Sequence, residues 1–208
     1  KSRSFAVTTA WIKTEPVMVA LIGAAALGDP LTLPMLAAIA VATTGVVILS
    51  TKPETTRSML HDLGPAATGL LAGLCFGLSA IGFRGGILAL PEASFLIRAS
   101  TTLVLSLMLQ TGMLLLWLAA FNRTALAASF KVWRASLLAG FLGAFASQFW
   151  FIGFSLTTAA NVRTLALVEV IMALAVSAWV FHQPVSTRQK LGIAVITLGV
   201  GLLLTLHP

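Results

Sequence analysis

Residues 15–49 read "EPVMVALIGAAALGDPLTLPMLAAIAVATTGVVIL", two apolar stretches joined by the turn sequence "LGDPLT". The run upstream of this segment, from residue 5, is mostly apolar as well. A helix needs roughly 20 apolar residues to cross a bilayer. The first stretch reaches that length once the upstream run is included, and the second comes close to it by itself. The segment therefore predicts a pair of membrane-spanning helices, with an acidic side chain, Glu15, inside the first of them.

The composition of the whole chain is that of a membrane protein. Of the 208 residues, 58% are hydrophobic and 9% are charged, and the mean hydropathy is +1.00, whereas a soluble domain carries roughly 25% charged residues. The strict alternation expected of β-barrel strands is absent. We therefore predict an all-α polytopic membrane protein with seven transmembrane helices, in the apolar runs 5–27, 33–50, 66–90, 93–121, 134–156, 159–181 and 188–206.

The opening segment recurs near the end of the chain. Residues 169–203, "EVIMALAVSAWVFHQPVSTRQKLGIAVITLGVGLL", align with residues 15–49 without a gap, at an offset of 154 residues. Shared apolar composition would give scattered matches, but this alignment superimposes rare residue types. The matched pairs are Glu15 with Glu169, Met18 with Met172, Pro30 with Pro184, Thr43 with Thr197, and Gly45-Val46 with Gly199-Val200.

The repeat predicts an inverted architecture. Residues 66–206 hold five spans, and the last two of these match the two spans within residues 1–49. An odd number of spans per copy makes the second copy enter the membrane in the opposite direction, as in transporters with a pseudo-twofold axis in the membrane plane. We expect 1–49 to be the last two helices of a first repeat, 50–65 an inter-repeat loop and 66–206 a complete second repeat of a ten-helix (5+5) fold. Truncation, a misassigned start or a frameshift would each explain the three missing helices.

Several motifs resemble those of the EamA-type members of the drug/metabolite transporter superfamily. "TEPVMVAL" and "LGDPLT" fit the first copy, and "FGLSAIGFRGGI" fits the opening helix of a second unit. In the second copy Val170 replaces the proline, and Gln183 stands where the family has an acid. The resemblance implies a ten-helix fold in two five-helix halves and a transport activity.

Glu15 and Glu169 lie near the centres of their predicted helices. An unpaired charge there costs at least about 2.5–3.5 kcal/mol. Inversion symmetry would bring both acids to the membrane midplane near the repeat axis, where such transporters bind substrate. Burial favours the neutral form of a carboxyl group, which suits a proton-coupled exchanger. The alternative is that a Lys, an Arg or a backbone donor satisfies each glutamate, which then only holds helices together. The possible cationic partners are Lys13, Arg98 and Arg163, and any such pair must form between different helices.

Pro16 predicts a kink beside Glu15, because proline cannot donate a hydrogen bond to the carbonyl of Ile12. Val170 takes the place of this proline in the second copy. We therefore expect the kink to belong to the first copy alone and the acid to be the feature that both copies share.

Four further residues are candidates for a substrate pathway. Arg98 either binds an anionic group or extends its side chain to the membrane interface. Gln148 and Trp150 lie in an aromatic stretch that either lines a cavity or packs against neighbours. Asn161 either caps its helix or faces the pathway.

Small residues predict close helix packing at two places. Gly69, Gly73 and Gly77 recur every four residues and form one face of a helix that a neighbouring backbone can approach. Gly140 and Gly143, together with nearby serine and alanine residues, repeat the pattern in the run 134–156.

The net charge of +7 is ordinary for loops that fix membrane topology, so we expect no nucleic-acid partner. Most Lys and Arg residues fall on one side of the predicted topology, and the positive-inside rule makes that side cytoplasmic. The family that the chain resembles has the opposite orientation, so the orientation stays open.

Trp117, Trp133 and Trp179 fit an interfacial belt. The lone cysteine, Cys75, is a packing residue inside a span.

The inverted repeat with its matched acids favours a secondary transporter that works by alternating access. The resemblance implies that it exports small metabolites, amino acids or amphipathic compounds and lies in a bacterial inner membrane. An enzyme is not expected, because no nucleophile with a base, aspartate pair or metal-ligand cluster can be assembled; neither a metal nor another cofactor is expected. The partners expected are a small-molecule substrate and the lipid bilayer, and a homodimer is left open. The alternative function is a non-transporting membrane scaffold or an inactive fragment of a transporter.

Overall fold

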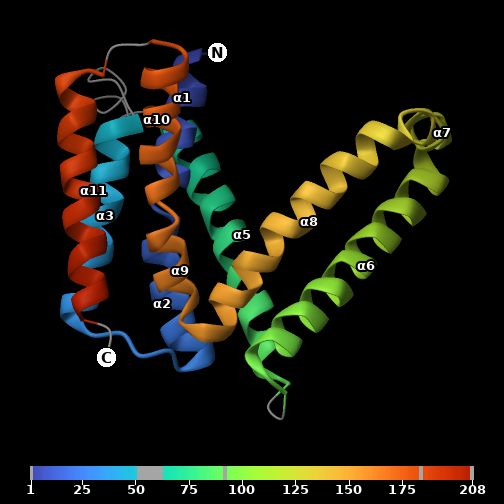
Figure 1. The fold of residues 1–208 in the computed structure, drawn as a ribbon, viewed down its shortest axis with the longest axis horizontal. Coiled ribbons are helices and arrows are strands. Elements are labelled where there is room, and N and C mark those ends of the chain that lie inside the picture. The colour runs from blue at the N-terminus through green and yellow to red at the C-terminus, as the bar shows by residue number, and fades with distance from the viewer. Residues whose placement is uncertain (1, 51–62, 91–92, 183–184, 207–208) are drawn as a thin grey trace. The chain divides into compact units, whose positions relative to one another are not determined.

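The computed structural model describes residues 2–50, 63–90, 93–182 and 185–206, and over these residues the chain forms helices and no strand (Figure 1). Seven segments are long and apolar enough to cross a membrane, so the predicted all-α polytopic class is confirmed. Most of the expected loop 50–65, with Lys52 and Arg57, lies outside the described residues, as does Lys1. The helices are α1 (Ser2–Ile12), α2 (Glu15–Leu27), α3 (Leu33–Ser50), α5 (Leu63–Leu88), α6 (Phe95–Phe121), α7 (Arg123–Lys131), α8 (Trp133–Leu156), α9 (Ala159–Leu165), α10 (Val168–Val180) and α11 (Thr187–Thr205).

The chain divides into two compact units. The first contains Lys1–Ile81 and Thr158–Pro208, and the second contains Gly82–Thr157. The first unit therefore holds both segments of the internal repeat, residues 15–49 and 169–203, and the second unit holds α6, α7 and α8.

Two of the spans are interrupted helices. In the span Val7–Leu27, α1 ends at Ile12 and α2 begins at Glu15; in the span Ala159–Val180, α9 ends at Leu165 and α10 begins at Val168. At the offset of the repeat, the two interruptions fall within one residue of each other. The expectation that only the first copy is kinked is therefore wrong.

The second interruption arises without a proline. Ala166 and Leu167 have ψ angles of -17° and -20°, which are close to those of a 3₁₀-helix. Accordingly, the backbone nitrogen of Val170 donates to the carbonyl of Leu167, three residues back, at 3.2 Å. Pro16 cannot donate, and the next nitrogen, that of Val17, donates to Thr14, also three residues back, at 3.1 Å. In both copies, therefore, the backbone next to the glutamate forms hydrogen bonds that reach three residues back instead of four. A short 3₁₀ stretch of this kind within a helix often marks a hinge.

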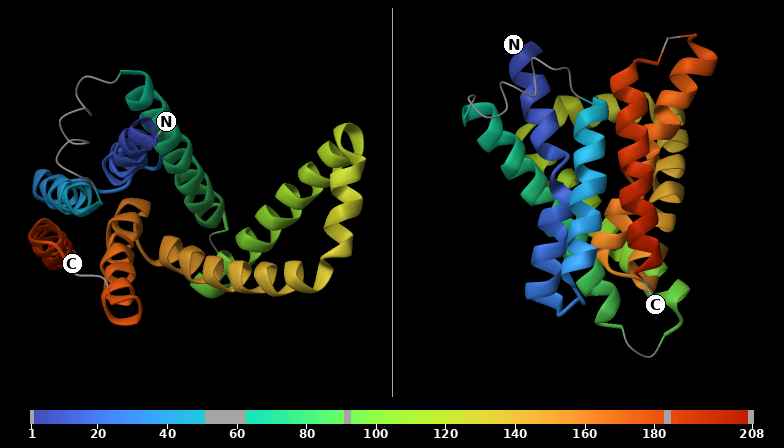
Figure 2. Two further views of the ribbon diagram at one scale, coloured as in Figure 1. Left: turned by 90° about the horizontal axis from the view of Figure 1, so that it is seen from above. Right: turned by 90° about the vertical axis from the view of Figure 1, so that its left-hand side faces the viewer.

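Helices α3 and α11 lie side by side and antiparallel in the first unit (Figures 1 and 2). A Cβ atom at Gly45 would lie 2.6 Å from the backbone nitrogen of Ile196, and one at Gly199 would lie within 3 Å of the backbone of Ala42. At the offset of 154 residues, Gly199 is the counterpart of Gly45 and Ile196 is the counterpart of Ala42. The two contacts are therefore reciprocal: each copy places its glycine against the same position of the other copy.

An apolar cluster surrounds this crossing and reaches the second interruption. Its buried residues are Ala42, Val46, Leu49, Leu167, Ile196 and Val200. Leu167 belongs to the turn between α9 and α10, so the cluster attaches that turn to the α3–α11 pair. The end of α3 is also tied to α11, because Arg188 Nε donates to the carbonyl of Ile48 at 2.9 Å. This core fixes the half-helix α9, which carries one member of the site described below.

In the second unit, α6 and α8 pack against each other, and Arg84 at the end of α5 holds the carboxyl end of α8. Arg84 Nη1 donates to the carbonyl oxygens of Phe154, at 2.7 Å, and Thr157. A cation is favoured at this end of a helix, where unpaired carbonyl groups concentrate negative charge. The ring of Phe83, beside Arg84, lies 4.9 Å from that of Phe151.

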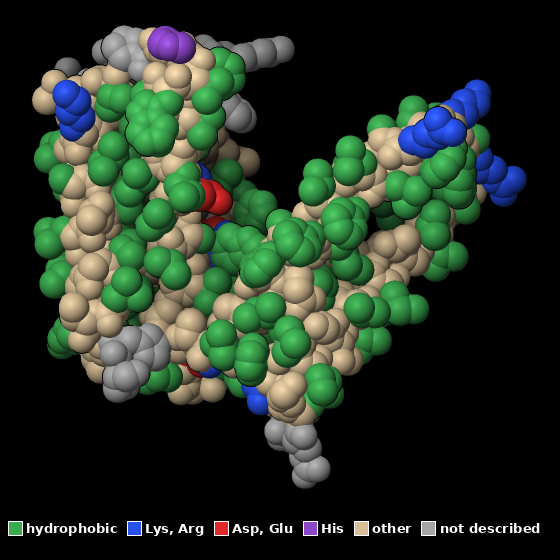
Figure 3. Space-filling view, viewed as in Figure 1, with side chains coloured by type: hydrophobic (Ala, Val, Ile, Leu, Met, Phe, Trp, Pro, Cys, Tyr) green, Lys and Arg blue, Asp and Glu red, His purple; other side chains and the backbone are tan. Residues whose placement is uncertain are grey.

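The outward faces of α6 and α8 are apolar. Met113 and Leu116 on α6 and Phe141 on α8 are each at least 66% exposed within the structure, and hydrophobic side chains cover much of both helices in Figure 3. Such faces suit a helix that meets lipid hydrocarbon, where no water competes for polar groups.

We expect Arg84→Met to destabilise the protein by about 1.5–3 kcal/mol, the usual value of hydrogen bonds to a charged group. Arg84→Lys, which keeps the charge but loses the planar fork of donors, should lose less. Thermal unfolding of the purified protein in detergent, followed by circular dichroism, measures the difference. Equal melting temperatures for Arg84→Met and the unmodified protein would show that the α8 cap contributes nothing.

Candidate functional site

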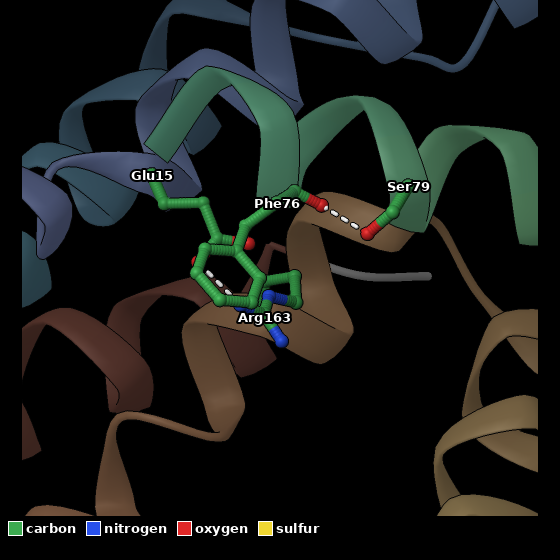
Figure 4. A network of polar contacts seen from close by, with 4 residues as sticks. All are labelled: Glu15, Phe76, Ser79 and Arg163. Carbon is green, nitrogen blue, oxygen red and sulfur yellow. Dashed lines mark hydrogen bonds and ion pairs between the residues drawn. The ribbon is translucent and has the colours of Figure 1, made fainter. Parts of the chain in front are cut away.

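The first unit holds a partly buried ion pair between α2 and α9. Arg163 Nη2 donates to Glu15 Oε2 (Figure 4). The Glu15 side chain is 8% exposed and the Arg163 side chain 24% exposed. Of the three cations considered as partners of Glu15, Arg163 is the one that the structure places against it.

The helix interruptions put each charge at a favourable helix end. Glu15 is the first residue of α2, where unpaired N–H groups favour an anion. Arg163 lies in the last turn of α9, where unpaired carbonyl groups favour a cation. Because α2 packs against α9, the two ends bring opposite charges together inside an apolar region.

The pair leaves part of the carboxylate unused. Glu15 Oε1 is buried and has no hydrogen-bond partner among the described residues. A buried acceptor without a partner costs about 1–3 kcal/mol, and more when it carries charge. The site can therefore accept one more hydrogen bond at this oxygen.

Helix α5 lies against α1 and α2 through its glycine face. A Cβ atom at Gly69 would lie within 3 Å of the backbone oxygen of Thr8, and one at Gly77 would lie 3.2 Å from Cγ2 of Val19. At Gly73 the nearest neighbour of such an atom would be the backbone oxygen of Ile12, at 3.5 Å. The three glycines thus let α5 run close to the interruption in front of Glu15.

Phe76 is a residue of this region that the sequence did not single out. In Figure 4 its side chain points from α5 toward the Glu15–Arg163 pair, and Ser79 Oγ donates to its carbonyl oxygen at 2.7 Å. The signal was its position between Gly73 and Gly77, on a helix whose small residues already indicated a close approach. Phe76 supplies an aromatic surface beside the charges.

Asn161 is buried in α9, but it is not the capping residue. The N-cap is Thr158, whose Oγ1 accepts a hydrogen bond from the backbone nitrogen of Asn161 at 3.3 Å. The interpretation of Asn161 as a helix cap is therefore wrong. Asn161 instead places a buried amide side chain two residues before Arg163 on the same short helix.

Glu169 differs sharply from Glu15, its counterpart in the repeat. It lies in the first turn of α10 but is exposed, and no described residue forms a hydrogen bond or ion pair with its side chain. The alignment explains this difference: the counterpart of Arg163 in the first copy is Thr9, which carries no charge. The repeat keeps two acids but supplies one cation at the equivalent positions.

The other predicted site residues belong to the second unit. Gln148 Nε2 on α8 donates to Ser100 Oγ on α6 at 3.1 Å, and the Trp150 ring lies 6.0 Å from that of Phe154. Arg98, two residues before Ser100, has a buried Nε without a partner among the described residues. These contacts make Gln148 a link between α6 and α8.

Gly140 and Gly143, on α8, have open space where a Cβ atom would stand: nothing described lies within 4 Å. In the second unit, the small residues of α8 therefore do not form the close backbone contact that α5 makes.

The seven apolar helices, each long enough to cross a bilayer, define the class of the protein: it is an integral multi-pass membrane protein. The EamA-like transporter family matches residues 64–205, from the first turn of α5 to the end of α11, and the chain belongs to this family. The resemblance drawn from the sequence motifs is thereby confirmed, and the protein is a membrane transporter of the drug/metabolite type. In comparisons with curated proteins and with solved structures, nothing matched the chain.

Proposed function

We propose that the protein is a secondary transporter that exports small metabolites, amino acids or amphipathic compounds across a bacterial inner membrane by alternating access. The observation that carries this proposal is the ion pair of the buried Glu15 with the partly buried Arg163, which joins two half-helices at their interruptions. Ionisable residues inside a membrane protein are costly and usually serve a transported species. Half-helix ends at mid-membrane are a recurrent way to build such sites.

The reciprocal contacts of α3 and α11 support an inverted repeat as the frame of this mechanism. Gly45 meets Ile196 as Gly199 meets Ala42, which is the pattern that a twofold axis between the two helices would produce. In an inverted repeat, one half rocks against the other and exposes the central site to each side in turn. The interruptions that both copies share provide points at which the helices can bend.

The charges of the site favour a dipolar substrate. The pair is neutral as a whole, so a molecule with one carboxylate and one ammonium group can replace both partners. The guanidinium of Arg163 would bind the carboxylate in the bidentate geometry that arginine favours, and Glu15 would accept from the ammonium group. Phe76 beside the pair suits an apolar or aromatic remainder of the substrate. The free oxygen of Glu15 offers the place for a coupling proton.

Transport into vesicles reconstituted with the purified protein tests this proposal. We expect phenylalanine to be carried faster than phenethylamine or phenylpropionate, each of which lacks one charged group. Glu15→Gln should lower the rate by about 10- to 100-fold, since a hydrogen bond to a charged group is worth about 1.5–3 kcal/mol. Glu169→Gln, the matched variant of the second copy, should lower it less, because Glu169 is exposed.

Two results would contradict the proposal. If both variants transport at unchanged rates at every pH, the carboxylates do not couple transport. If the unmodified protein carries none of the three probes above the leak of empty vesicles while it remains folded, the non-transporting scaffold or inactive fragment is the better description.

A further inference from the structure

Helix α7 joins α6 to α8 and lies across them. It contains nine residues, Arg123–Lys131. In Figure 1 it is seen end-on while α6 and α8 run in the plane of the picture, and the view from above in Figure 2 shows the same crossing. Because α6 and α8 are long and apolar enough to cross a membrane, a helix that crosses both at their joined ends is placed to lie along the membrane surface.

This helix carries positive charge, and no acidic residue of α6, α7 or α8 balances it. Arg123 and Lys131 on α7 and Arg134 in the first turn of α8 are all exposed, and Lys and Arg side chains gather around α7 in Figure 3. The sequence from residue 93 to residue 157 contains neither Asp nor Glu. The surface therefore presents three cations to the molecules that lie beside α7 at the membrane surface.

Large apolar side chains stand among these cations. Phe121, Phe130 and Trp133 are 72%, 68% and 53% exposed. The guanidinium carbon of Arg134 lies 5.4 Å from the centre of the Trp133 ring, so the cation and the aromatic ring form one surface. Tryptophan beside a cation is typical of the zone where acyl chains meet headgroups.

We propose that α7 together with Trp133 and Arg134 forms a binding surface for the headgroups of anionic phospholipids. The lipid phosphate would accept hydrogen bonds from Lys131 and Arg134, while Phe130 and Trp133 lie among the upper acyl carbons. A soluble acidic partner fits less well, because it would leave these apolar side chains in water. The proposal concerns a different unit from the Glu15–Arg163 site and does not depend on the substrate.

Native mass spectrometry of the detergent-purified protein, titrated with phosphatidylglycerol or phosphatidylcholine, tests this surface. We expect the protein to retain phosphatidylglycerol in preference. Lys131→Gln with Arg134→Gln should weaken that retention by about fivefold per charge, the usual effect of one basic residue near an anionic surface. Arg123 is left unchanged because its Nε also donates to the carbonyl of Ala119 at 2.9 Å.

Two controls make the test specific. Lys131→Arg with Arg134→Lys keeps the charges and should keep retention, and Lys190→Gln removes an exposed cation of α11 and should change it little. Equal retention of the two lipids, an equal loss with Lys190→Gln, or displacement of phosphatidylglycerol by excess glycerol phosphate would each overturn the proposal. The last result would indicate a site for free phosphate rather than for lipid.

Discussion

Glu15→Gln is expected to destabilise the protein by about 1.5–3 kcal/mol, because it removes the carboxylate charge that accepts a hydrogen bond from the partly buried Arg163 guanidinium. The neutral amide can still accept one hydrogen bond, but it no longer offsets the cost of holding the guanidinium in a partly desolvated position. The free energy of unfolding can be measured in mixed detergent micelles with increasing denaturing detergent, followed by circular dichroism.

The double variant Glu15→Gln with Arg163→Gln separates folding from transport. Removing both charges restores the charge balance of the site, so the stability should return to within about 1 kcal/mol of the unmodified protein, as replacements of other ion pairs indicate. Transport should not return, since neither group remains to bind a dipolar substrate. Glu169→Gln is the matched control, and because Glu169 is exposed its effect on stability should stay within about 0.5 kcal/mol.

The result that would contradict this prediction is a double variant as unstable as Glu15→Gln. In that case the shape of the Glu15 side chain, rather than its charge, would matter at this position. A double variant that transports normally would show instead that the pair is structural and that the substrate binds elsewhere.

The sequence was sufficient to predict the spans and to single out Glu15. Hydropathy alone predicts seven segments, because the requirement of about 20 apolar residues is set by the bilayer rather than by the fold. Glu15 stood out because a carboxylate inside such a segment is costly. The family was also predictable, since its motifs combine a turn with residues of restricted type, as in "LGDPLT".

The partner of Glu15 could not be chosen from the sequence. Lys13, Arg98 and Arg163 were all candidates, and the choice depends on which helices pack together, which hydropathy does not encode. The difference between Glu15 and Glu169 could have been predicted from the sequence, because extending the alignment upstream places the neutral Thr9 opposite Arg163. Such an extension predicts that one of the two glutamates has a cationic partner and that the other has none at the equivalent position.

No residue in the sequence indicated the interruption between α9 and α10. Proline is the usual mark of a helix break, and the second copy has Val170 where the first has Pro16. The break instead arises from hydrogen bonds that reach three residues back, as from Val170 to Leu167. The turn packs against the α3–α11 core through Leu167, a tertiary contact that no local preference in the sequence predicts.

Gly199→Ala is expected to destabilise the protein by about 1–3 kcal/mol or more, the usual cost of overpacking, and to lower transport with it. The new Cβ atom would stand within 3 Å of the nitrogen, Cα and Cβ of Ala42. Two of these atoms are backbone, so a side-chain rotation cannot relieve the clash and α3 would have to move. Such a movement would disturb the cluster that holds Leu167 and, through the turn, the half-helix that carries Arg163.

Gly201→Ala provides the matched control on the same helix. A Cβ atom at Gly201 would meet nothing within 4 Å, and replacing an unconstrained helical glycine by alanine stabilises by roughly 0.5–1 kcal/mol. The two alanines should therefore shift the unfolding free energy in opposite directions, as measured in the same detergent titration. Gly45→Ala, the reciprocal change, should resemble Gly199→Ala, because its Cβ atom would stand 2.6 Å from the backbone nitrogen of Ile196. If Gly199→Ala and Gly201→Ala behave alike, the α3–α11 contact is not what holds this unit together.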